Sequence, residues 1–129
     1  MKTEITLCFD FGNSRKKLAV FSNKKIIAER ILYTDTSGEI ETLLQEFKPQ
    51  KSILSSVINH NPGIEDTLKE KTHFHKLSVA TKLNFTAPVG KPETIGADRL
   101  AIAAAAVHFF PKKNNLVIGL GSCITFNFI

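Results

Sequence analysis

The order of hydrophobic periods along the chain restricts its fold more than any other feature. Alternating apolar residues predict strands over 4–11, 17–21 and 25–32, joined by tight turns. Segments with helical spacing then alternate with short strands: helix 39–47, strand 52–58, helix 62–71, a weak strand 75–79, helix 97–109, and strands 116–120 and 124–129. This order predicts an α/β fold in which helices flank a mixed β-sheet.

Length and hydropathy limit the classes of protein that need consideration. A chain of 129 residues predicts one domain rather than a two-domain enzyme, and 43% hydrophobic with 22% charged residues is ordinary for a globular protein. The longest apolar run, 102–110, is interrupted by His108 and is far shorter than the roughly twenty residues of a membrane span. A strand pattern follows Met1 directly, where a signal peptide would begin. We therefore expect a cytoplasmic protein with no membrane association.

Charge, cysteines and histidines indicate no nucleic-acid or metal site. The net charge of +5 comes from dispersed lysines, without the clustering and interleaved aromatics of a nucleic-acid surface. Cys8 and Cys123 lack metal-ligand spacing, and we interpret them as a pair of buried thiols. His73 and His75 point to one side of a predicted strand, but without a third ligand nearby partly exposed imidazoles are the favoured interpretation.

The first candidate site is the turn after the first predicted strand. Asp10 ends that strand two residues before Gly12, which permits close approach of backbone N–H groups to an anion, and Asn13 and Ser14 add side-chain donors. A carboxylate there is suited to holding a divalent cation through water. An Asx-type hairpin turn is the alternative, and it is the commoner use of such residues.

The second candidate site follows a proline-containing loop, 81–92, of the kind that often carries function. Asp98 is suited to accepting a proton from a substrate hydroxyl, and Arg99 to clamping a carboxylate with two hydrogen bonds. The alternative is that Asp98 only favours the positive end of a helix dipole while Arg99 pairs with Glu93. Phe85 in the loop belongs either to a pocket wall or to the core.

Three segments, in order, resemble the signatures of type III pantothenate kinases: residues 10–14, DFGNS; residues 92–100, PETIGADRL; and residues 117–125, VIGLGSCIT. The resemblance covers the whole chain. It implies an actin-like (ribonuclease H-like) domain over 1–115 and the first strands of a second, truncated one over 116–129. It also implies ATP-dependent phosphorylation of pantothenate, the first step of coenzyme A synthesis, by a homodimer that uses Mg²⁺ and a monovalent cation, K⁺ or NH₄⁺.

The same resemblance implies a role for individual residues. The ATP phosphates would be contacted by Asp10, Phe11, Gly12, Asn13, Ser14, Arg15, Lys16, Lys17 and Ser122, with Asp10 also near Mg²⁺. Pantothenate would be contacted by Val89, Gly96, Ala97, Asp98 and Arg99. Asp98 would accept the proton of its primary hydroxyl, and Arg99 would meet its carboxylate.

This sequence departs from the family pattern at three positions. Gly119 stands where the family usually has an acidic residue that helps hold the monovalent cation, Ser122 stands where Thr is usual, and Val89 stands where an aromatic residue is frequent. Two other functions stay open. One is a non-catalytic module that binds a partner or the full-length enzyme through an edge strand at 125–129. The other is a regulatory or nucleic-acid-binding role, favoured only by the positive charge.

Overall fold

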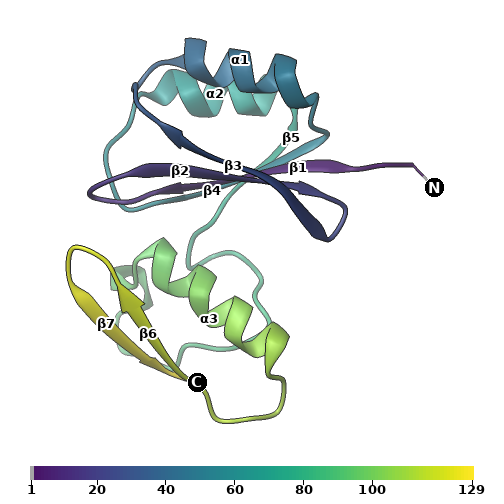
Figure 1. Ribbon diagram of the computed structural model, residues 1–129. Coiled ribbons are helices and arrows are strands. Elements are labelled where there is room, and N and C mark those ends of the chain that lie inside the picture. Colours follow the sequence, from purple (N-terminus) through teal and green to yellow (C-terminus); the bar gives the residue numbers. More distant parts are fainter. Residues whose placement is uncertain (1) are drawn as a thin grey trace. The chain divides into compact units, whose positions relative to one another are not determined.

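The computed structural model describes residues 2–129 and divides the chain into two compact units (Figure 1). The first unit ends at Lys76, and the second comprises Leu77–Ile129. The first unit contains β1 (Ile5–Phe11), β2 (Lys16–Ser22), β3 (Lys25–Leu32), α1 (Ser37–Phe47), β4 (Lys51–Ser56), α2 (Pro62–Lys71) and β5 (His73–Lys76). The second contains the short 3₁₀ turn η1 (Pro92–Thr94), α3 (Ala97–Phe109), β6 (Leu116–Leu120) and β7 (Ile124–Phe128).

The first unit is built on a mixed five-stranded sheet in the order β3-β2-β1-β4-β5. Strand β2 is antiparallel to both of its neighbours, whereas β1, β4 and β5 run parallel to one another. The parallel strands are connected through α1 and α2, which lie together over one face of the sheet (Figure 1). The predicted α/β fold with a mixed sheet is therefore confirmed.

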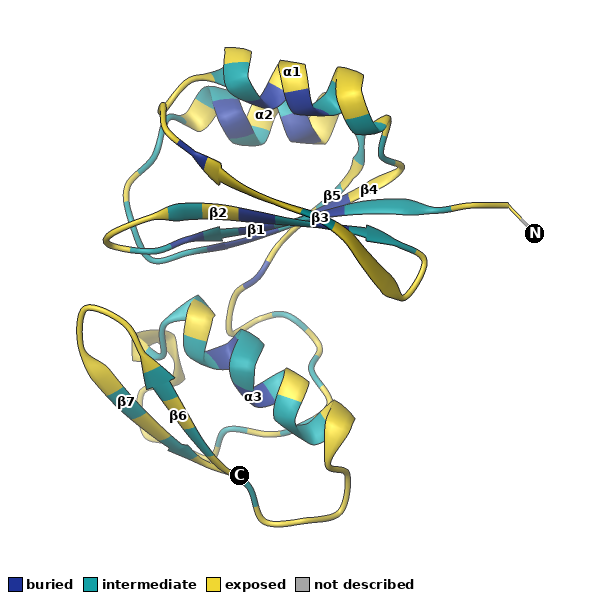
Figure 2. Ribbon diagram, in the orientation of Figure 1, coloured by how far each residue is buried: buried dark blue, intermediate teal, exposed yellow. Residues whose placement is uncertain are grey.

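The core of the first unit lies between the sheet and these two helices, where the strand alternation places Leu7, Phe9 and Phe11 (Figure 2). Ile40 and Leu43 of α1 face them because three residues return a helix to nearly the same side. Odd-numbered residues of β1 therefore face the helices, and even-numbered ones, Asp10 included, face the other way.

The ends of both covering helices follow from local chemistry. Helix α1 ends at Lys48, whose left-handed backbone (φ 47°) lets its N–H reach the Leu44 carbonyl, and Pro49 cannot continue the helix. Helix α2 begins with Pro62 at its first position, where no N–H is needed. The Asn61 side chain caps it by accepting a 2.9 Å hydrogen bond from the Gly63 N–H.

The second unit pairs α3 with a two-stranded antiparallel ribbon, β6–β7. One face of this ribbon meets α3, since a Cβ built on Gly119 would lie 3.5 Å from Ile102 Cδ1. The opposite face is exposed (Figure 2) and consists of three apolar cross-strand pairs. These pairs, here called the apolar ribbon face, are Leu116 with Phe128, Ile118 with Phe126, and Leu120 with Ile124.

Two predictions from the sequence were wrong in detail. The weak strand predicted over 75–79 is β5, which lies at His73–Lys76 because its pairing with β4 begins directly after α2 ends. Cys123 is exposed rather than buried, because it lies in the tight turn between β6 and β7. Cys8 is half-buried, and its burial raises the pKa of the thiol. The division into domains at residue 115 stays a prediction.

Among residues 2–129, no helix combines the length and the apolar character that crossing a membrane requires. Helix α3 is the most apolar of the three, but it has only 13 residues. Its buried residues are Leu100 and Ala103, whereas Ala105 is exposed.

Candidate functional site

The β1–β2 hairpin presents Asp10 beside Lys17. These residues are paired across the two strands, and Lys17 Nζ lies 3.9 Å from Asp10 Oδ2. The turn is closed by a 2.9 Å hydrogen bond from the Gly12 N–H to the Arg15 carbonyl, and residues 13–15 at its tip are exposed. A carboxylate, an ammonium group and an open turn thus lie at one end of the sheet.

Lys16 points to the other face of the hairpin, toward the helices. Its ammonium donates a 2.9 Å hydrogen bond to Asp35 Oδ1 and lies 5.6 Å from the centre of the Phe11 ring, and its side chain is only 18% exposed. Adjacent residues of a strand point to opposite faces of the sheet, so the side chains of Lys16 and Lys17 have different neighbours. In this structure Lys16 is held by a carboxylate of the β3–α1 connection.

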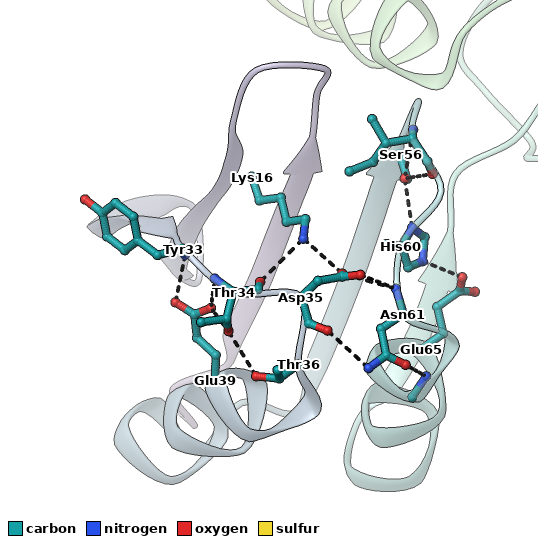
Figure 3. A network of polar contacts seen from close by, with 12 residues as sticks. Lys16, Tyr33, Thr34, Asp35, Thr36, Glu39, Ser56, His60, Asn61 and Glu65 are labelled. Carbon is teal, nitrogen blue, oxygen red and sulfur yellow. Dashed lines mark hydrogen bonds and ion pairs between the residues drawn. The ribbon is translucent and has the colours of Figure 1, made fainter.

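Asp35 joins that connection to the start of α2, as Figure 3 shows. Its carboxylate accepts the Asn61 N–H at 3.0 and 3.1 Å, while the Asn61 side chain donates to the Asp35 carbonyl. The hydrogen bonds from Lys16 and from Asn61 lower the pKa of the Asp35 carboxyl, against a weaker opposing effect of burial. Asp35 therefore binds the turn end of the β1–β2 hairpin to the loop that precedes α2.

His60 continues this network under the end of β1. Its Nε2 lies 2.7 Å from Glu65 Oε2, and its Nδ1 lies 3.1 Å from Ser56 Oγ (Figure 3). Its ring packs edge-on against the Phe11 ring, with 5.3 Å between the ring centres. Lys76 donates a further 3.0 Å hydrogen bond to Glu65 Oε2. Burial alone would raise the pKa of Glu65, but the hydrogen bonds from Lys76 and His60 outweigh it and leave the pKa below its ordinary value.

We expect Glu65→Gln to reduce the loss in the free energy of unfolding that the protein shows at acidic pH. A carboxyl whose pKa is lower in the folded than in the unfolded chain, where it is about 4.3, stabilises the fold above that pH. This contribution is lost as the pH falls through the folded-state pKa. Urea unfolding at pH 7 and pH 3 should thus differ less for Glu65→Gln than for the natural chain. Glu70→Gln on the exposed side of α2 is the control, and equal pH dependence in all three proteins would contradict the expectation.

The second candidate site lies at the start of α3. Gly96 precedes the helix, and its carbonyl accepts the N–H groups of Arg99 and Leu100. Asp98 is exposed in the first helical turn, where its Oδ1 also accepts the Arg99 N–H at 2.9 Å. The Arg99 guanidinium reaches β7, donating to Asn127 Oδ1 at 2.7 Å and to the Phe126 carbonyl at 3.2 Å. Arg99 therefore holds the ribbon to the helix, a role that the sequence did not indicate.

The loop before α3 encloses a cavity of about 230 Å³. Phe85, Pro92 and Leu100 are among the residues that line it, so Phe85 is a pocket wall. Val89 is half-exposed on the same loop. Ser122 lies in the exposed turn of the β6–β7 ribbon. The second unit thus brings Asp98 and a cavity with a mixed polar and apolar lining to one end of α3.

A model of the type III pantothenate kinase family matches residues 6–129. The chain belongs to this family. It is similar to the type III pantothenate kinase of Christiangramia forsetii, with 37% identity over 125 residues. It is also similar to those of Cytophaga hutchinsonii and Flavobacterium johnsoniae, each at 32% identity over 128 and 126 residues. These alignments cover 95 to 97% of this chain but only 51 to 52% of each relative. The chain therefore spans about half the length of these curated kinases.

The residues around Gly119 do not fit the monovalent-cation site that the kinase family implies. Gly119 supplies no carboxylate, and a Cβ at this position would lie 2.6 Å from Thr125 Oγ1 on the facing strand. Among residues 2–129, no group of three His, Cys, Asp or Glu side chains is arranged to hold a metal ion. We therefore assign no step to a monovalent cation at this position.

We expect Gly119→Ala to destabilise this chain by about 1–3 kcal/mol, because the added methyl overlaps Thr125 Oγ1. Thr125→Ala removes that oxygen, so the double variant should recover most of the loss. Urea unfolding of the four proteins gives the coupling energy directly. Additive effects of the two substitutions would show that the contact at Gly119 is not the cause.

Sequence reasoning missed three features of this chain: the network through Asp35 and His60, the attachment of Arg99 to β7, and the buried hydroxyl of Ser55 in β4, which has no hydrogen-bond partner among the described residues. Charged and polar residues at loop positions gave no signal of their partners, because the contacts join residues distant in sequence. For Ser55, the available signal was a serine directly after the apolar pair Ile53 and Leu54 in a strand expected to be buried.

Proposed function

We propose that this chain carries the phosphate-binding and pantothenate-binding parts of an ATP-dependent pantothenate kinase. The enzyme transfers the terminal phosphoryl group of ATP to the primary hydroxyl of pantothenate, the first step of coenzyme A biosynthesis. The supporting observation is that the family match extends through both candidate sites, the Asp10 hairpin and the start of α3. Phosphoryl transfer relies on positioning and charge neutralisation, and both sites offer groups suited to these tasks.

In this proposal the hairpin binds the ATP phosphates. The fold does not require glycine at position 12: its φ is not positive, and the nearest heavy atom to an added Cβ is the Arg15 carbonyl oxygen at 3.4 Å. Close approach of a phosphate to the backbone explains the residue instead. Lys17 supplies positive charge, and Asp10 would hold Mg²⁺, which offsets negative charge on the phosphates when bound. Lys16 acts indirectly, by fixing the hairpin through Asp35.

Asp98 is the proposed proton acceptor. It is exposed, and the hydrogen bond from the Arg99 N–H fixes one of its oxygens while the other stays open to a substrate hydroxyl. Arg99 has donors beyond the two that hold β7, and we assign these to the pantothenate carboxylate. Gly96, Ala97 and Val89 would line the same substrate site, and Ser122 would contact phosphate from the ribbon turn.

We further propose that the five-stranded sheet belongs to a ribonuclease H-like, actin-like domain over 1–115. The strand order and the single antiparallel member, β2, support this assignment. Residues 116–129 would then begin a second domain. The apolar ribbon face supports that division. Its six large apolar side chains are 50 to 81% exposed, and packing against further elements of a second domain would bury them. The resemblance also favours a cytoplasmic protein that forms a homodimer. Light scattering of the purified protein measures its molar mass and so tests the homodimer.

The apolar ribbon face also favours a second function, that of a non-catalytic module. Strand β7 is paired on one side only, so a strand from another protein can extend the ribbon while its side chains cover the face. A chain that binds such a partner but never consumes ATP would fit this alternative.

A coupled assay of ADP release distinguishes the two functions. The 129-residue chain is incubated with ATP, pantothenate, Mg²⁺ and K⁺, alone and together with the separately expressed remaining half of the Christiangramia forsetii kinase. We expect pantothenate-dependent ADP release in the mixture. If the two halves form a complex that releases no ADP, the kinase proposal fails and the binding module stands.

A further inference from the structure

Three neighbouring strands place Lys17, Asp10 and Ser55 in one row across the sheet. Asp10 of β1 is paired with Lys17 of β2 on one side and with Ser55 of β4 on the other. All three face away from the core, since the preceding pair in β1 and β4, Phe9 and Leu54, is buried under the helices. Strands β1 and β4 are parallel, and this row lies near their carboxyl ends, where open α/β sheets bind ligands.

Ser55 stands out in this row because its hydroxyl is buried and unpaired. Its residue exposure is 8%, and among the described residues its Oγ is the one buried side-chain oxygen or nitrogen without a hydrogen-bond partner. An unpaired buried hydroxyl is destabilising, and such a group in a native protein calls for an explanation, for example a catalytic role or a bound water or ion. Ser52, three residues earlier in β4 and 3% exposed, has a partner in Thr72 Oγ1 at 2.6 Å.

We propose that Ser55 is a positioning residue for Asp10 in the metal–nucleotide complex. Its hydroxyl donates a hydrogen bond to the Asp10 carboxylate once that carboxylate turns from Lys17 toward the metal ion. This inference rests on the proposed function, since it assumes that the hairpin binds a divalent metal with a nucleotide.

The geometry permits this hydrogen bond without movement of the backbone. Adjacent strands lie about 4.8 Å apart, and paired side chains on one face come within reach of each other. The serine hydroxyl moves by rotation about a single bond. A hydrogen bond to a charged carboxylate is about twice as strong as one between neutral groups. It would occupy one lone pair of Asp10 and leave the remaining ones for the metal or its bound water.

Ser55 and Ser52 give a matched pair of variants in one strand. Ser55→Ala removes a hydroxyl that has no partner in the unliganded chain, so the melting temperature should stay constant or rise. Ser52→Ala breaks a buried hydrogen bond, so the melting temperature should fall by about 4–8 °C. This contrast is independent of any ligand.

The decisive experiment is calorimetric titration of the 129-residue chain with ADP, with and without Mg²⁺, for the natural chain and for Ser55→Ala, Ser55→Thr and Ser52→Ala. We expect Ser55→Ala to reduce the Mg²⁺-dependent gain in ADP affinity about tenfold. Ser55→Thr, which keeps the hydroxyl, should retain the gain, and so should Ser52→Ala despite its lower melting temperature.

The outcomes separate this inference from the proposed function. If the natural chain shows the Mg²⁺-dependent gain and Ser55→Ala shows the same gain, the positioning role is overturned while the nucleotide site stands. A melting temperature of Ser55→Ala that falls as far as that of Ser52→Ala also overturns it, because the hydroxyl then has a structural partner. If the natural chain binds no ADP with Mg²⁺, the hairpin is not a nucleotide site in this chain and the inference fails with it.

Discussion

Asp98→Asn is expected to lower the rate of pantothenate-dependent ADP release by about 10²–10⁴-fold in the two-half mixture, the range for losing a general base. Asparagine has the same shape, and its side-chain oxygen still accepts the Arg99 N–H that Asp98 Oδ1 accepts at 2.9 Å. The start of α3 should therefore keep its structure, while the group that we propose as the acceptor of the substrate proton is lost. The effect should fall on kcat, because the exposed carboxylate contributes little to holding the substrate.

Glu93→Gln is the matched control for this prediction. Glu93 is an exposed carboxylate in η1, five residues before Asp98. The Glu93→Gln substitution therefore removes one negative charge from the same region, as Asp98→Asn does. Its rate should stay within about twofold of the natural chain. If Asp98→Asn and Glu93→Gln reduce the rate equally, Asp98 acts only through the local electrostatic field, and the proton is accepted elsewhere.

Local patterns sufficed for most of the secondary structure because each element carries its own signal. The limits of β3, α2 and α3 coincide with those predicted from alternation, from Pro62 and from the apolar helix before Pro111. The position of β5 was less predictable, since Leu77 and Val79 continue the alternation beyond Lys76, the last residue that pairs with β4. Pairing between distant strands, rather than the local pattern, decides where that strand ends.

The candidate site was only partly predictable from the sequence for the same reason. Asp10 and Asp98 could be predicted as candidate site residues, because each is a carboxylate two residues from a glycine, Gly12 or Gly96. Two adjacent lysines, Lys16 and Lys17, look alike in the sequence, yet the strand places them on opposite faces, where one meets Asp35 and the other Asp10.

Arg99 and Ser55 required the tertiary structure. Arg99 binds Asn127 of β7, which is 28 residues away in the sequence. Ser55 lies beside Asp10 of β1, which is 45 residues away. Contacts between residues so far apart cannot be predicted from the pattern of neighbouring residues in the sequence.

The packing of Phe11 links stability to the candidate site. This ring is 0% exposed at the end of β1, immediately between Asp10 and Gly12. It contacts Phe9 edge-on at 6.0 Å and His60 at 5.3 Å, and the Lys16 ammonium lies over it. Phe11 is therefore the hairpin residue that packs in the core and also contacts both Lys16 and His60 of the polar network.

Phe11→Ala is expected to destabilise the protein by about 3–5 kcal/mol, because it removes buried surface and leaves a cavity that the surrounding β-sheet cannot close. Such a loss approaches the whole stability of many domains, so a large unfolded fraction should be visible by circular dichroism at 37 °C. Phe128→Ala, at a phenylalanine that is 77% exposed, should change stability by less than about 0.5 kcal/mol. Phe11→Leu refills most of the space and should recover more than half of the loss. A Phe11→Ala protein as stable as Phe128→Ala would mean that the hairpin is anchored by β-sheet hydrogen bonds alone, and the network beneath it would then have no part in holding Asp10.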